Sequence, residues 1–96
     1  MIAVNFPFIK SIHFEELNIP NDDKANKKYK QYFYLFINCR NFRSMKNIQN
    51  SYCFFSLESH ILTIKANQNF IEICLDILNQ FENSNLEINL KKTEPL

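Results

Sequence analysis

The chain has 96 residues, 46% of them hydrophobic, with a net charge of +1 and no glycine. This length fits one domain, and the hydrophobic content is too high for a disordered chain. The near-neutral charge provides no global attraction to nucleic acid or membranes, and the lack of glycine excludes Gly-rich phosphate loops.

Hydrophobic patterning predicts an α+β domain over residues 1–96. It is a two-layer arrangement in the order β-β-β-β-α-β, with one helix on a mainly antiparallel sheet of four to five strands. Alternating apolar residues predict the first strand at 8–14. Residues 15–28 combine Pro20 with clustered Asn, Asp and Lys, which predicts a long loop.

The aromatic segment 29–40 predicts the second strand. Side chains alternate along a strand, so one face carries Phe33, Leu35 and Ile37 as an ordinary core face. The opposite face then carries an aromatic-basic stripe, and a half-exposed strand would be polar there. The residues of this stripe are Lys30, Tyr32, Tyr34, Phe36 and Arg40. Something must therefore cover that face, either more of this chain, a second copy, a partner protein or nucleic-acid bases.

The rest of the chain gives clearer patterns. Residues 41–51 read as a loop or a short helix that places Met45 and Ile48 inward. Residues 52–57 and 60–66 predict a hairpin joined at Glu58–Ser59, and the lack of glycine argues against type I′ and II′ turns. The helix is expected over about 69–83, where apolar residues recur at helical spacing and Asn69 resembles an N-cap. Residues 86–91 alternate like a half-exposed strand, and 92–96 read as a flexible tail.

The sequence contains no residue pattern typical of a catalytic or metal-binding site. The soft ligands are Cys39, Cys53, Cys74, His13 and His60, and no two cysteines have the close spacing of a structural zinc site. Cys53 and His60 are the residues to consider for thiol catalysis, but no third member or oxyanion hole accompanies them. We therefore expect no enzyme activity, no catalytic residues, no metal and no cofactor.

The cysteines and the N-terminus indicate the compartment. Three unpaired cysteines argue against a disulfide framework, and the N-terminus does not resemble a signal peptide. The longest apolar run, from Tyr32 to Ile37, is too short to span a bilayer. These features predict a cytoplasmic protein with no membrane partner.

Charge and aromatic content together favour a binding function. Residues 1–50 carry eight bases and four acids, whereas residues 51–96 carry three bases and six acids. The expected partner-binding residues are the aromatic-basic stripe together with Lys27, Lys28 and Arg43, because Tyr, Phe and Arg are enriched at interface centres. The prediction is a small binding protein that inhibits or modulates a protein or ribonucleoprotein effector, of the general type of anti-CRISPR or toxin-immunity proteins. The alternative is a single-stranded RNA or DNA-binding module that uses the stripe for base stacking. A homodimer is compatible with either.

Overall fold

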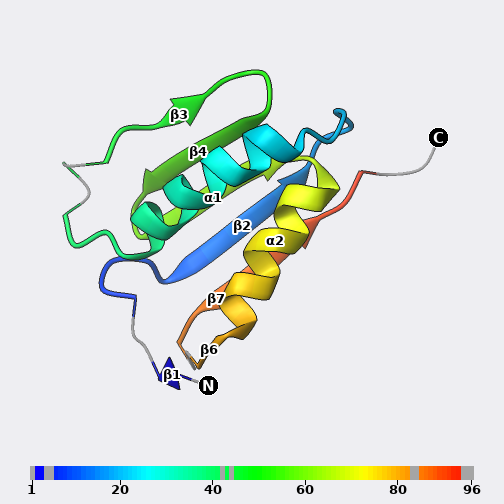
Figure 1. Cartoon of the computed structure of the whole chain (residues 1–96). Coiled ribbons are helices and arrows are strands. Elements are labelled where there is room, and N and C mark those ends of the chain that lie inside the picture. The colour runs from blue at the N-terminus through cyan, green and yellow to red at the C-terminus, as the bar shows by residue number, and fades with distance from the viewer. Residues whose placement is uncertain (1, 4–5, 42, 44, 83–84, 94–96) are drawn as a thin grey trace.

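The computed structural model of the chain describes residues 2–3, 6–41, 43, 45–82 and 85–93. Helices α1 (Asp23–Ile37) and α2 (Gln68–Asn79) lie side by side on one face of a five-stranded sheet, and no described helix covers the other face (Figure 1). The sheet contains β2 (Ser11–Glu16), β3 (Ile48–Gln49), β4 (Cys53–Glu58), β5 (Ile61–Ala66) and β7 (Glu87–Lys91). A small separate sheet pairs β1 (Ile2–Ala3) with β6 (Phe81–Glu82).

The sheet is mixed, with the strand order β3-β4-β5-β2-β7. Strand β2 runs parallel to both β5 and β7, whereas β4 is antiparallel to β3 and β5. The α+β class is confirmed, but the mainly antiparallel sheet and the single helix are not. Two helical crossovers explain the difference, because α1 connects β2 to β3 and α2 connects β5 to β7, and each such connection returns the chain parallel to its starting strand.

Helix α1 replaces the strand predicted at 29–40 and much of the loop predicted at 15–28. Its buried residues follow a helical spacing that begins inside the predicted loop: Asn26, Tyr29, Phe33, Phe36 and Ile37. The Asp22 side chain caps the helix by accepting a hydrogen bond from the Ala25 N–H at 3.1 Å. Residues 15–16 belong to β2, so only the segment between Glu16 and Asp23 connects the two elements.

Helix α2 and strands β4, β5 and β7 lie close to their predicted positions, whereas β2 begins at Ser11 rather than at residue 8, and the short strands β1, β3 and β6 were not predicted. Phe70, Cys74, Ile77 and Leu78 are buried, as the predicted apolar stripe requires. The N-cap is Asn67 rather than Asn69, and its side chain accepts the Phe70 N–H at 2.8 Å. The helix ends at Asn79, before the predicted boundary.

The turn between β4 and β5 contradicts one expectation from composition. Its two residues, Ser59 and His60, have φ values of 51° and 68°. Positive φ at both central positions is the geometry of a type I′ turn, which usually contains glycine or asparagine. The chain therefore forms a left-handed turn from residues that pay a steric cost there.

The core lies between the sheet and the two helices. Phe55 of β4 stacks on Phe36 of α1, with ring centroids 5.2 Å apart, and meets Phe70 of α2 edge-on at 5.9 Å. Met45 and Ile48 are half-buried and pack against this core, as predicted, although Ile48 lies in strand β3 rather than a helix. Thr93 is held to Glu16 by two hydrogen bonds of 2.9 Å, so this part of the predicted flexible tail is anchored, while residues 94–96 lie outside the described residues.

Candidate binding surfaces

The predicted partner-binding residues do not form a continuous stripe, because they lie on a helix and in the segment after it. Lys27, Lys28 and Lys30 are exposed on the first half of α1. Beyond the helix, Arg40 and Arg43 are also exposed.

The aromatic part of the predicted site is mostly core. Phe36 is fully buried, and Tyr32 and Tyr34 are half-buried side chains that pack against the core. A helix turns by about 100° per residue, so alternate residues point in different directions. Phe36 is therefore a packing residue, and the expected strand platform for base stacking does not form.

The outer face of α1 is formed by residues at positions i, i+3, i+4, i+7 and i+11. These residues are Lys24, Lys27, Lys28, Gln31 and Leu35, and all five are exposed. Leu35 is 58% exposed, which makes it the most exposed of the large hydrophobic side chains in the described chain. The prediction that Leu35 lies on the core face of a strand is wrong, because the segment is a helix and Leu35 is exposed on its outer side. Lys24 was assigned to a loop for the same reason, and helical spacing would have placed Lys24, Gln31 and Leu35 on one face.

The outer face of α1 has an uncompensated positive charge. In the part of the chain that the structure describes, Lys24, Lys27 and Lys28 form no ion pair. Lys28 places its Nζ atom 5.6 Å from the Tyr29 ring centroid, so its only described partner is an aromatic ring. Asp23 is the one acidic residue within α1. This surface therefore presents positive charge on the first half of α1 and an exposed aliphatic side chain near its end.

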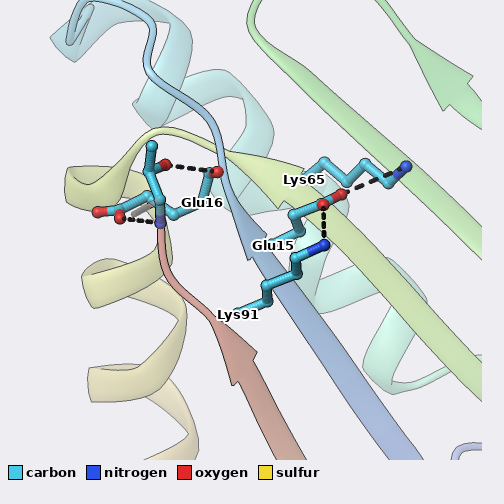
Figure 2. Close-up of polar contacts among 5 residues, drawn as sticks. Glu15, Glu16, Lys65 and Lys91 are labelled. Carbon is cyan, nitrogen blue, oxygen red and sulfur yellow. Dashed lines mark hydrogen bonds and ion pairs between the residues drawn. The ribbon is translucent and has the colours of Figure 1, made fainter. Parts of the chain in front are cut away.

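The open face of the sheet has a different character, because the charged side chains at its centre are paired (Figure 2). Glu15 of β2 lies between Lys65 of β5 and Lys91 of β7, with N···O distances of 3.4 and 3.5 Å. The hydrogen bond from Lys65 lowers the pKa of the Glu15 carboxyl, against the opposing effect of partial burial. Lys65 also lies 5.2 Å from the ring centroid of Phe54. The open face is consequently balanced in charge along its centre.

A third feature lies at the carboxyl ends of β2 and β5. A shallow depression of about 280 Å³ is lined by the segment after β2, the start of α2 and Thr93. Open α/β sheets often bind ligands at this end of their strands. Here, however, the Glu16 side chain is bonded to Thr93, and Asn67 caps α2. The polar groups at this position thus stabilise the fold.

The thiols are shielded from solvent. Cys39, Cys53 and Cys74 are free and buried. Burial raises the pKa of Cys53 to about 11, against a smaller opposing effect of its hydrogen bond with Asn50, and burial also raises the pKa of Cys74. A thiol with a raised pKa is a poor nucleophile, because the thiolate is the reactive form.

The candidate catalytic and metal ligands do not converge. Cys53 begins β4 and His60 lies in the turn at the other end of the same hairpin, so the two residues are not neighbours. The His60 ring contacts Phe8 instead, with its Nδ1 atom 2.7 Å from the Phe8 carbonyl oxygen. Across residues 6–41, 43, 45–82 and 85–93, no three His, Cys, Asp or Glu side chains are grouped where they could hold a metal ion.

Comparisons with known proteins add no family assignment. Searches against protein-family models, curated proteins and solved structures found no match to this chain. Neither helix of the described chain has the length and hydrophobicity needed to cross a bilayer.

Proposed function

We propose that this chain is a non-enzymatic binding protein that docks on an acidic surface of a larger protein through the outer face of α1. The observation that carries the proposal is the exposed set of unpaired lysines that shares one face of α1 with the exposed Leu35. Inhibition or modulation of the protein to which it docks is the role that we assign to the complex.

The charge of this face supports an acidic partner. Complementary charges accelerate the encounter of two proteins and suppress binding to wrong partners. Lys24, Lys27 and Lys28 contribute three positive charges within little more than one helical turn, and no described acidic side chain pairs with them. The free energy of desolvating these lysines would be offset by carboxylates of the partner.

Leu35 supports a protein rather than a nucleic acid as the partner. Protein interfaces combine an apolar centre with a polar rim, whereas phosphate contacts need only charge and hydrogen-bond donors. Leu35 would supply the apolar centre, with the half-buried Tyr32 beside it one helical turn away. The lysines at the other end of the helix would form the rim.

The test is affinity capture from the native host's lysate with the whole chain as bait, with and without nuclease. We expect a protein that the wild type retains after nuclease treatment and that the K24E/K27E/K28E variant fails to retain. The matched control is K10E/K46E/K92E, which reverses three exposed lysines elsewhere on the surface. The control should retain the same protein.

Two results would contradict the proposal. Capture that nuclease abolishes would assign the lysines to phosphate binding, and mixed-sequence RNA or DNA oligonucleotides should then bind with a steep dependence on salt. Capture that both charge variants retain equally would place the interface elsewhere. Circular dichroism of each variant establishes that α1 remains folded.

A further inference from the structure

The two edges of the sheet are unequal. At one edge, β3 is only two residues long and pairs with Phe54 and Phe55 of β4, so the open edge there is divided between two short segments. At the other edge, β7 has five residues, and no described strand pairs with its outer side. Proteins usually protect edge strands by making them short, charged or bulged, because an open edge is a template for another strand. Strand β7 is thus the longer continuous edge, and a strand that pairs with it must match its charged residues, Glu87 and Lys91.

The side chains of β7 that face the helices are incompletely covered. Ile88 and Leu90 pair in register with the fully buried Ile12 and Phe14 of β2, yet they remain 43% and 42% exposed. A groove of about 160 Å³ lies beside Leu90 and is lined in part by Ile71 and Leu75 of α2. Helix α2 therefore leaves the aliphatic side chains of Ile88 and Leu90 partly uncovered at the edge of the sheet.

The backbone of these same two residues faces outward. The Glu87 N–H donates to the Lys10 carbonyl at 3.0 Å, so Glu87 turns its backbone groups toward β2. Backbone N–H and C=O groups alternate sides along a strand, so Asn89 and Lys91 also turn inward. Ile88 and Leu90 then present their N–H and C=O groups to a further strand.

We propose that a second copy of this chain pairs with β7 in antiparallel orientation, with the two-fold axis at Asn89. This register places Ile88 opposite Leu90 of the second copy, as a hydrogen-bonded pair, and Asn89 opposite Asn89. It also places Glu87 opposite Lys91 of the second copy, and by symmetry this ion pair occurs twice. The β7 sequence, Glu-Ile-Asn-Leu-Lys, is therefore complementary to itself in charge and in apolar side chains.

Neighbouring two-fold registers lack this complementarity. The requirement that outward-facing residues pair with each other permits a shift of the axis to Ile88 or to Leu90. With the axis at Ile88, Glu87 lies opposite Asn89, and with the axis at Leu90 it lies opposite Thr93. Only the register centred on Asn89 pairs each charge of β7 with its opposite. Lys91 is 79% exposed even while it contacts Glu15, so its ammonium group retains donors for a second carboxylate.

A disulfide trap tests the register directly. Opposed residues of a non-hydrogen-bonded antiparallel pair have Cα atoms about 4.5 Å apart, within the range of roughly 4.4–6.8 Å that a disulfide spans. Asn89→Cys should therefore form a covalent dimer under mild oxidation, because position 89 lies opposite itself. Lys91→Cys is the matched control, because it lies opposite position 87 and should stay monomeric. The three native thiols are buried and do not compete in the folded protein.

A charge-swap cycle tests the interface without cross-linking. Sedimentation equilibrium of the wild type should show a dimer at about 0.5 mM protein, and Glu87→Lys or Lys91→Glu should each raise the dimer Kd about tenfold, because each change opposes two like-charged pairs. The double variant E87K/K91E should restore dimerisation, since it reverses both members of each pair. A purely structural role of either residue predicts no such rescue.

Three outcomes overturn the proposal. These are a wild type that is monomeric at about 0.5 mM, equal cross-linking of the two cysteine variants, and a double swap no tighter than the single ones. If the wild type is monomeric, a strand of a different protein remains as the occupant of this edge. Circular dichroism of each variant verifies that loss of the dimer is not loss of the fold.

Discussion

Phe54 and Phe55 are consecutive residues of one strand, yet they belong to different environments. Phe55 is fully buried beneath both helices, where it contacts Phe36 and Phe70. Phe54 lies on the open face of the sheet, half-buried beside Lys65. Because side chains alternate along β4, the cover provided by α1 and α2 decides the role of each ring.

The two faces of the sheet also differ in where charged side chains lie. The covered face is apolar along the centre of the sheet, from Phe14 through Ile64 to Phe55. The open face crosses the same strands through Glu15 and Lys65, which are paired with each other. Burial of apolar side chains therefore stabilises the fold on the covered face, whereas the exposed ion pairs of the open face contribute little to stability.

The largest expected effect is that of removing the Phe55 ring. Phe55→Ala should lower the free energy of unfolding by about 3–5 kcal/mol, because it leaves a cavity between both helices and the sheet. Urea denaturation followed by circular dichroism measures the change. Phe54→Ala is the matched control and should cost less than about 1 kcal/mol, since the surrounding face is solvated. Equal losses for the two variants would contradict the contrast between the faces.

The reactivity of the thiols tests the same contrast between the covered and the open face of the sheet. Cys53 lies on the covered side of β4 with a pKa of about 11, so few molecules carry the reactive thiolate near neutral pH. We expect an aromatic disulfide reagent to label folded wild-type protein at least about 100-fold more slowly than the unfolded chain. The control Glu58→Cys, on the open face of the same strand, should react rapidly. Fast labelling of folded wild-type protein would show that solvent reaches the covered face.

The N-cap residues of α1 and α2 stabilise the two helices that cover the sheet. Asn67 is 5% exposed and its side chain accepts the Phe70 N–H at 2.8 Å, so Asn67→Ala should cost about 1–2 kcal/mol. Asp22→Ala should cost somewhat less, about 1 kcal/mol, because this cap is more exposed and its bond is longer. Asn67→Asp, which keeps an acceptor, should retain most of the stability. A loss at Asn67→Asp equal to that at Asn67→Ala would show that the cap bond does not matter.

Some of this fold could be predicted from the sequence, and some could not. Helix α2 was identified because its apolar spacing fits the helical period, and the β4–β5 hairpin because its two segments are rich in strand-forming residues around a tight connection. The segment of α1 is ambiguous, since Phe33 and Ile37 satisfy both strand alternation and helical spacing. The residues that distinguish a helix from a strand here are Asn26, before the aromatic segment, and Tyr29, at its start. Asn26 is buried and polar, and its side-chain amide donates to Asn21 at 2.6 Å, so a hydrophobicity pattern does not reveal it.

Of the candidate surfaces, only the exposure of the charged side chains could be predicted from the sequence. Lys27, Lys28 and Lys30 were placed correctly on the exterior, because long charged side chains are rarely buried. The assignment of Phe36 to the same surface was wrong, because it depended on the wrong period. The edge position of β7 could not be predicted at all, because strand order is set by contacts between segments far apart in the chain.

The turn that joins β4 to β5 contains a strained residue, and replacing it should stabilise the protein. Ser59 has a φ of 51°, a conformation that costs a residue with a Cβ atom more than it costs glycine. Ser59→Gly should raise the free energy of unfolding by about 0.5–1 kcal/mol, after allowance for the added freedom of the unfolded chain. Thermal unfolding measures this gain, and Ser56→Gly, within the strand, is the control that should lose stability. A loss at Ser59→Gly would mean that the turn is not strained.

The smallest expected effect concerns the ion pairs of the open face. The pKa of Glu15 is lowered in the folded state, chiefly by the hydrogen bond from Lys65, so the folded protein favours the ionised carboxylate. This contribution is complete above the unfolded pKa near 4.5 and is lost as pH falls through the lower folded value. Glu15→Gln should therefore be less stable than the wild type at neutral pH by less than about 1 kcal/mol, and the two should converge in acid. Added salt should reduce the difference further, because exposed pairs are screened. A loss of stability in Glu15→Gln as large as that expected for Phe55→Ala would show that the open face contributes as much to stability as the covered face.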